Sequence, residues 1–330
     1  MMEMTPQQLK LMKKDLRRRF SITGWTLLIY YCIMNVCVFF MAFFEILGSM
    51  FAALGRNDFQ GASDAGNGAL ESAWGYFLAV LIGLFILFVW KKKAFWKDEI
   101  WAKGNPMSVG SFLGLLCIFL SGQLVYQVVM IFVELILNGM GLSVLQGMEA
   151  VSMDSSSFSM FLYGGIVAPI SEELLFRGLI QRSLRPFGRR FAILASAFTF
   201  GIFHGNLLQA PYAFLVGLVL GYVASEYSIA WAMLLHMINN LVLGDLIPRL
   251  TSSMSMEVTS LVIWAVLLMA AIGAVVTLIV KRREIRSYSE ESPINRTFVG
   301  CFFSSPGIVV LMVVMGLNML TTIIYMITPL

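Results

Sequence analysis

Both histidines of this 330-residue chain, His204 and His236, stand in long apolar runs, and so does Glu172. An ionisable side chain inside a bilayer costs roughly 2.5–3.5 kcal/mol on insertion scales, so such side chains are candidates for function. A carboxylate or an imidazole can take a proton from water, and imidazole or amide N–H groups can stabilise a developing oxyanion. These residue types could therefore carry general acid–base chemistry.

Helical spacing separates the two adjacent glutamates. Glu173 and Arg177 are four residues apart, so on a helix they face each other and are predicted to form an ion pair with a supporting role. Glu172 is turned about 100° away and has no partner in its own helix, which makes it the candidate general base. His236 and Asn240 also share one helix face and form a predicted donor pair, for which Asn239 is the alternative amide.

The composition defines the elements that must position these residues. Of the chain, 58% is hydrophobic and only 13% is charged, whereas soluble domains are about 45–50% apolar and about 25% charged. The apolar runs are continuous, which excludes a transmembrane barrel and predicts an all-α, polytopic helical bundle. We expect nine spans, over 22–50, 72–90, 110–138, 159–181, 190–207, 210–225, 229–247, 258–280 and 302–328.

The basic residues indicate an orientation for these spans. Twenty of the 23 lysines and arginines fall before the first span or in the loops after the second, fourth and eighth, all on one side of the membrane. The positive-inside rule therefore predicts a multi-pass protein with a cytoplasmic N-terminus and an external C-terminus. The same distribution predicts a lipid bilayer partner and no nucleic acid. The oligomeric state is left open.

The predicted organisation has four parts. A basic cytoplasmic segment (1–21) precedes three spans with their loops (22–158). A core of four spans (159–247) holds all the candidate site residues, and two further spans with a basic loop (248–330) follow it.

Three motifs in this core resemble those of the CPBP family of CAAX prenyl endopeptidases and bacteriocin-processing or Abi-type intramembrane proteases. They are Glu172-Glu173-x-x-x-Arg177, Phe200-x-x-x-His204 and His236-x-x-x-Asn240, in that order on separate spans. The lead-in from Val167 to Gly178 is most similar to the bacterial branch, which implies a location in a bacterial plasma membrane. The resemblance implies that Glu172 and His204 activate a water molecule, that His236 and Asn240 stabilise the oxyanion, and that Glu173 and Arg177 support them.

Several alternatives stay open. Glu172, His204 and His236 could instead form a zinc site with one open position, although neither histidine lies in an H-E-x-x-H helix. Metal-free hydrolysis without a cofactor is the favoured interpretation. A non-catalytic immunity or peptide-binding protein of the same fold is the main alternative function, and a transporter is a further one. The predicted partner is a membrane-associated protein or peptide substrate.

Overall fold

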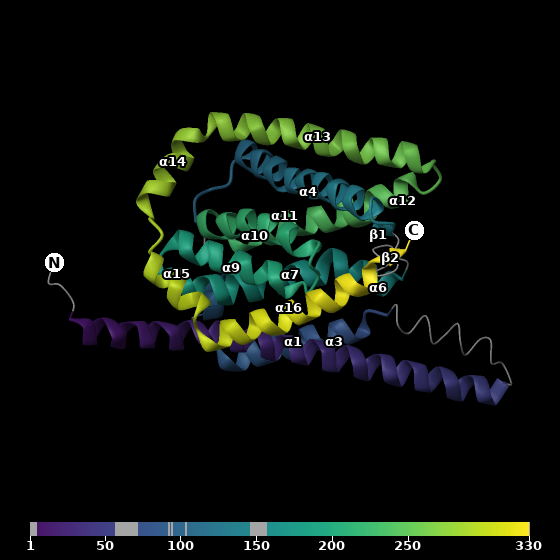
Figure 1. The fold of residues 1–330 in the computed structure, drawn as a ribbon, viewed down its shortest axis with the longest axis horizontal. Helices are drawn as coiled ribbons and strands as arrows, with labels where there is room; N and C mark the ends of the chain where they lie inside the picture. Colours follow the sequence, from purple (N-terminus) through teal and green to yellow (C-terminus); the bar gives the residue numbers. More distant parts are fainter. Residues whose placement is uncertain are drawn as a thin grey trace.

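The computed structural model describes residues 5–56, 72–91, 93, 95–102, 104–145 and 157–329, and over these residues the fold is an all-α bundle, as predicted (Figure 1). Each expected span coincides with a helix or with a run of consecutive helical segments. These are α1 (Pro6–Arg56), α3 (Trp74–Trp90), α4 (Val109–Asn138), the run from α6 (Phe158–Leu162) to α8 (Arg182–Leu184), α9 (Arg189–Phe203), α10 (Gln209–Glu226), α11 (Ile229–Leu241), α13 (Met256–Val280) and α16 (Pro306–Met326).

Six helical segments among the described residues are long and apolar enough to cross a membrane. They are Pro6–Ala53, Val109–Asn138, Phe158–Phe187, Ile229–Thr251, Met256–Val280 and Pro306–Met326. The α3 helix is apolar but has only 17 residues, and α9 and α10 are not among the six. The chain is therefore an integral membrane protein with a polytopic helical fold, and the number of nine crossings stays a prediction.

Shorter elements complete the described chain. Four are π-helical, one is a 3-10 turn, three are α-helices, and two short strands pair antiparallel. They are η1 (Phe95–Ile100), η2 (Tyr163–Val167), η3 (Leu174–Gln181), η5 (Val242–Leu246), the 3-10 turn η4 (Arg185–Phe187), α12 (Ile247–Thr251), α14 (Arg282–Glu291), α15 (Arg296–Phe303), and β1 (Leu142–Ser143) with β2 (Thr328–Pro329).

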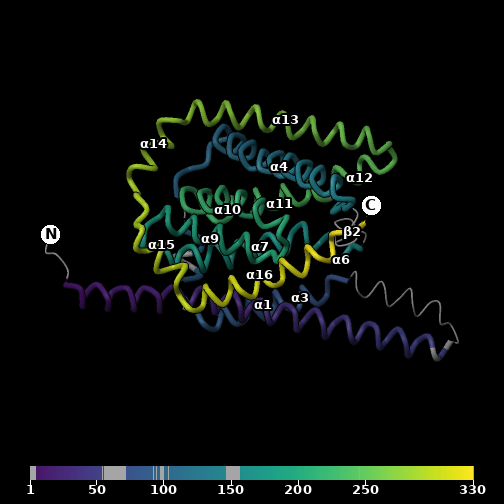
Figure 2. The backbone as a smooth tube through the Cα atoms, viewed as in Figure 1, coloured from purple at the N-terminus to yellow at the C-terminus, as the bar shows by residue number. Residues whose placement is uncertain are grey.

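The long helices lie roughly along one direction in three layers (Figure 1). The α4 and α13 helices pack together as one outer layer, α9, α10 and α11 occupy the middle, and α1 packs on α3 and α16 as the other outer layer. The two termini lie at opposite ends of the bundle, and α14 runs along the N-terminal end to join the α13 layer to α15 (Figure 2). Which of the two ends faces the cytoplasm stays a prediction.

Two glycines allow α1 and α16 to touch backbone to backbone. A Cβ atom at Gly24 would lie 2.1 Å from the carbonyl carbon of Gly307. The Gly307 N–H donates a hydrogen bond of 2.7 Å to Ser21 Oγ on α1. Because neither glycine can gain a side chain without moving a helix, this crossing fixes where α1 lies on the bundle.

Candidate active site

The two glutamates lie on a short α-helix between two π-helical segments. This helix is α7 (Ala168–Glu173), with η2 before it and η3 after it. A π-helical turn inserts an extra residue into the helix and is often found at functional sites. The π segments were not predicted, and they turn the residues after Glu173 away from the positions that a continuous α-helix over 159–181 would give them.

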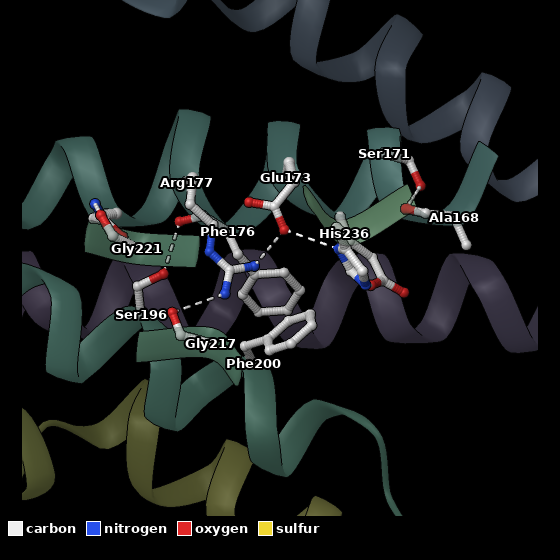
Figure 3. A network of polar contacts seen from close by, with 12 residues as sticks. Ala168, Ser171, Glu173, Phe176, Arg177, Ser196, Phe200, Gly217, Gly221 and His236 are labelled. Atoms are coloured by element: carbon white, nitrogen blue, oxygen red, sulfur yellow. Dashed lines mark hydrogen bonds and ion pairs between the residues drawn. The ribbon is translucent and has the colours of Figure 1, made fainter. Parts of the chain in front are cut away.

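The predicted ion pair between Glu173 and Arg177 is present and completely buried. Arg177 Nη1 donates to Glu173 Oε1 at 2.8 Å, and both side chains have 0% exposure. The same Glu173 oxygen is 3.0 Å from His236 Nδ1 on α11, so one carboxylate oxygen joins an arginine of its own helix to a histidine of another (Figure 3). Spacing within one helix predicts the first contact but gives no information about the second.

Two main-chain carbonyls of α10, both of glycines, accept further hydrogen bonds from side chains of η3. Arg177 Nη2 donates to Gly217 O at 3.1 Å, and one turn further Gln181 Nε2 donates to Gly221 O at 2.8 Å. The Arg177 guanidinium also lies over the Phe200 ring of α9, 4.4 Å from its centroid, a favourable cation–π distance. The ion pair therefore anchors the glutamate helix to α9 and α10.

The contact with Glu173 determines which nitrogen of His236 carries a proton. The Glu173 carboxylate is paired with Arg177 and can only accept, so the Nδ1–H of His236 must donate to it. His236 Nε2 then points toward Glu172, with 3.8 Å between Nε2 and Glu172 Oε2. That distance is too long for a hydrogen bond and leaves both atoms able to bind a third group.

The two glutamates differ sharply in accessibility. The Glu172 side chain is 29% exposed, whereas that of Glu173 is completely buried. Water or a substrate can therefore reach Glu172 but not Glu173. This difference agrees with the prediction that Glu172 is the reactive carboxylate and Glu173 a supporting one.

We expected His204 to lie inside a helix over 190–207, but the structure places it at the end of a helix. The α9 helix stops at Phe203, His204 caps it, and Gly205 adopts a left-handed conformation with φ +62° that ends the helical path. The Nδ1–H of His204 donates to the carbonyl oxygen of Phe200 at 2.8 Å. The Phe200 ring lies 4.8 Å from the His204 ring and 5.9 Å from the His236 ring, measured between centroids, so both histidines pack on one aromatic side chain beside the glutamate helix.

Asn240 lies one turn beyond His236 on α11, as its spacing predicts, but its amide is already engaged. Its Nδ2 donates to Gly164 O at 2.8 Å, and its Oδ1 accepts from Asn239 Nδ2 at 3.0 Å. Asn239 in turn accepts from the hydroxyl of Tyr212 on α10 at 3.0 Å. One N–H of Asn240 stays available, and the alternative amide, Asn239, serves to position it.

Sequence reasoning missed the aromatic residues around Glu172. Tyr30 of α1 and Tyr163 of η2 both lie within electrostatic range of this carboxylate. Tyr30 and Ser171 also line an apolar cavity of about 360 Å³ between α1, α3 and the glutamate helix. No motif marks Tyr30, because it reaches the site only through the packing of α1 on the core.

The alternative zinc site is not preformed among the described residues. Among them, no three side chains of His, Cys, Asp or Glu are grouped so that they could hold one metal ion. The Nδ1 atoms of His236 and His204 are committed to Glu173 and Phe200, which leaves their Nε2 atoms free. Because histidines that bind zinc make the same kind of second hydrogen bond, zinc binding by Glu172, His204 and His236 stays the alternative to metal-free hydrolysis.

Comparison with known proteins locates the resemblance on this segment. Residues 154–242 match a family described as type II CAAX prenyl endopeptidase, Rce1-like. This range contains every predicted site residue, so the resemblance to CAAX-type proteases is confirmed for this part of the chain. No curated protein and no solved structure matches the chain. Assignment to the bacterial branch stays a prediction.

Proposed function

We propose that this integral membrane chain, whose residues 154–242 are a CAAX-protease-type segment, is an intramembrane endopeptidase that cleaves a membrane-associated protein or peptide. The family description names a prenyl endopeptidase, which makes a lipid-modified peptide one substrate class to test. Signalling or leader peptides held at the membrane are the other. Hydrolysis without a metal is the mechanism that the arrangement of the residues supports best.

One observation carries the proposal: two adjacent glutamates have opposite environments. Glu173 is buried and neutralised by Arg177, and it holds His236 in one orientation. Glu172 is accessible and faces the free Nε2 of that same histidine at 3.8 Å. An accessible carboxylate beside an oriented imidazole is the arrangement that general acid–base catalysis requires.

The proposed reaction begins with a water molecule bound at Glu172 and His204. Glu172 takes one proton from this water, and the oxygen forms a bond to the carbonyl carbon of the substrate peptide. The carbonyl π electrons move to the oxygen, which becomes an oxyanion. The C–N bond then breaks as the proton held by Glu172 passes to the leaving nitrogen, so that a carboxylic acid and an amine are the products.

His236 and Asn240 are the proposed donors to the oxyanion. When His236 is protonated, its Nδ1–H stays on Glu173 and its Nε2–H becomes available to the substrate oxygen. Asn240 offers the amide N–H that Gly164 does not use. Donors that are already oriented in a site of low dielectric constant stabilise a developing charge strongly, and loss of one such donor costs about 100-fold to 1,000-fold in kcat.

The test compares cells that carry the wild-type protein, the Glu172→Gln variant or the His204→Ala variant. Cells that lack the protein give the baseline. The peptides of the membrane and of the medium are identified by mass spectrometry, and purified protein is incubated with a farnesylated peptide ending in a CAAX sequence. We expect both variants to reach wild-type membrane levels and to lose cleavage. Glu257 is an exposed glutamate at the start of α13, and the Glu257→Gln variant is the matched control, which should keep full cleavage. Full cleavage by normally expressed Glu172→Gln protein would refute the assignment.

A further inference from the structure

One face of α1 changes from basic to apolar along its length. Lys10, Lys14, Arg18, Ile22 and Trp25 follow one another at intervals of four, four, four and three residues, which places them on one side of the helix. Ile29 and Ile33 continue the same line. The first three side chains are exposed and cationic, and the others are apolar, so on this face a charged segment is followed directly by an apolar one.

The basic part of this face forms a groove with the α15–α16 junction. The groove is lined by Lys10, Lys13, Lys14, Arg17 and Arg18, together with other residues that include Ser304 and Pro306. Arg17 is fixed there because its Nε donates to Ser304 Oγ at 3.0 Å.

The three basic residues of the α1 face have no anionic partner within the described chain. The nearby carboxylate of Asp15 is bound to Arg19 at 2.8 Å. Within the part of the chain that the structure describes, Lys10, Lys14 and Arg18 form no ion pair, so their charges are available to an external anion.

The apolar part of the face lines the 360 Å³ cavity, which adjoins the basic groove. Ile22 and Trp25 line both spaces, so the two lie next to each other. The other wall of the cavity is formed by α3, which contributes Leu87 and Trp90 among other residues, and Ser171 beside the glutamate site also lines it. Its lining is almost entirely apolar, and α1 and α3 form an outer layer of the bundle (Figure 1).

We propose that this composite surface is a binding site for an anionic phospholipid of the surrounding bilayer. The phosphate of the headgroup binds Lys10, Lys14 and Arg18, and one acyl chain enters the cavity between α1 and α3. Clusters of basic residues next to a membrane helix bind anionic headgroups in this way, with about 1 kcal/mol for each basic residue. A free phosphate would use the groove but not the adjoining cavity, whereas a phospholipid matches both. The inference does not depend on the proposed proteolysis.

The site can be tested through Trp25, which lies where the headgroup and the chain meet. Wild-type protein in mixed micelles is titrated with phosphatidylglycerol or with phosphatidylcholine, each carrying brominated acyl chains that quench nearby tryptophan fluorescence. Three basic residues at about 1 kcal/mol each predict a preference for phosphatidylglycerol of about 100-fold. Because Trp90 also lines the cavity, a chain bound there quenches both residues. In protein that carries both Trp25→Phe and Trp90→Phe, the quenching that is specific to phosphatidylglycerol should disappear.

Charge variants separate the headgroup contact from a general surface effect. The triple variant Lys10→Gln, Lys14→Gln, Arg18→Gln should bind the two lipids equally. Its matched control replaces three exposed arginines at the same end of the bundle (Arg282→Gln, Arg283→Gln, Arg296→Gln) and should keep the preference. Circular dichroism and gel filtration check that each variant is folded.

Five outcomes would overturn the proposal. The first two are equal quenching of the wild type by both lipids and a preference that survives the Lys10, Lys14 and Arg18 substitutions. The third is a preference that survives the combined Trp25→Phe and Trp90→Phe substitutions, which would mean that the chain lies elsewhere. The fourth is displacement of the lipid by inorganic phosphate at equal concentration, which would mean that the site binds a free anion. The fifth is displacement by the farnesylated peptide with cleavage lost in the same titration, which would assign the cavity to the substrate.

Discussion

The buried pair Glu173–Arg177 makes a quantitative prediction about folding. Both side chains have 0% exposure, so neither charge can be solvated by water if the other is removed. We consider Glu173→Leu and Arg177→Met, which keep the approximate volume of each side chain, and the double variant that carries both. Because removal of one partner of a buried ion pair leaves an uncompensated charge, each single variant should lose about 3–5 kcal/mol of unfolding free energy.

The double variant should lose far less unfolding free energy than the sum of the losses of the two single variants. It contains no buried charge, and its remaining cost comes mainly from the His236 Nδ1–H, which loses its acceptor, because the Gly217 carbonyl lies within α10 and keeps its helical hydrogen bond. One unpaired polar group costs about 1–3 kcal/mol, so we expect a loss of about 1–3 kcal/mol instead of the additive 6–10 kcal/mol. The coupling between the two sites is therefore about 6 kcal/mol.

Unfolding of the purified proteins in micelles by a denaturing detergent, followed by circular dichroism, measures this coupling. Membrane levels in cells are a second readout, since an additive loss would remove most of the stability of a typical protein. The exposed pair Arg286–Glu290, also four residues apart, is the matched control, and its double variant should show no measurable coupling. Additive losses at Glu173 and Arg177, within about 0.5 kcal/mol, would refute the reasoning.

Three further predictions concern packing, a buried amide and metal dependence. Gly24→Ala should lower the free energy of unfolding by about 1–3 kcal/mol because the new Cβ meets the backbone of Gly307. Gly48→Ala on the same helix is the control, since its Cβ meets no other atom and the substitution should be neutral or stabilising. Equal melting temperatures of the two variants would argue against the α1–α16 contact. Gln181→Leu should cost about 1–3 kcal/mol in a denaturation assay because two hydrogen bonds of the buried amide are lost, to the Gly221 carbonyl and to Ser225 Oγ, and an unchanged midpoint would contradict this. Cleavage by purified protein should persist after chelation and dialysis, and stoichiometric zinc whose removal abolishes cleavage would disprove the metal-free mechanism.

Composition and helical spacing predict the features that depend on local geometry. The excess of apolar residues predicts the all-α membrane fold, and the four-residue spacing predicts the ion pair of Glu173 with Arg177. The membrane fold follows from the contact of apolar side chains with lipid, and the ion pair follows from the contact of each side chain with the next turn of its own helix. The same argument places His236 and Asn240 on one face of α11.

Contacts between helices could not be predicted in this way. The hydrogen bond from His236 to Glu173 depends on how α11 packs against α7, and the approach of Tyr30 depends on where α1 crosses α16. The end of α9 at Phe203 differs from the expected span over 190–207, because the apolar run continues past the helix end and the left-handed φ of Gly205 is visible only in the structure. Each of these features is set by tertiary packing, which one sequence does not encode as a spacing.

The acceptors used by Arg177 and Gln181 have a consequence for how this site changes during evolution. Both acceptors are main-chain carbonyls, at Gly217 and Gly221, so no side chain on α10 takes part in either bond. Gln181 Nε2 also donates to the side-chain oxygen of Ser225 on α10 at 2.9 Å. A Cβ atom at Gly221 would lie 2.7 Å from the Gln181 amide oxygen, and one at Gly217 would lie 3.2 Å from Ala197. Positions that change together in relatives of this chain could therefore reveal the contact of Gln181 with Ser225. The two bonds to glycine carbonyls would instead be recorded as two positions, four residues apart, that stay without a side chain.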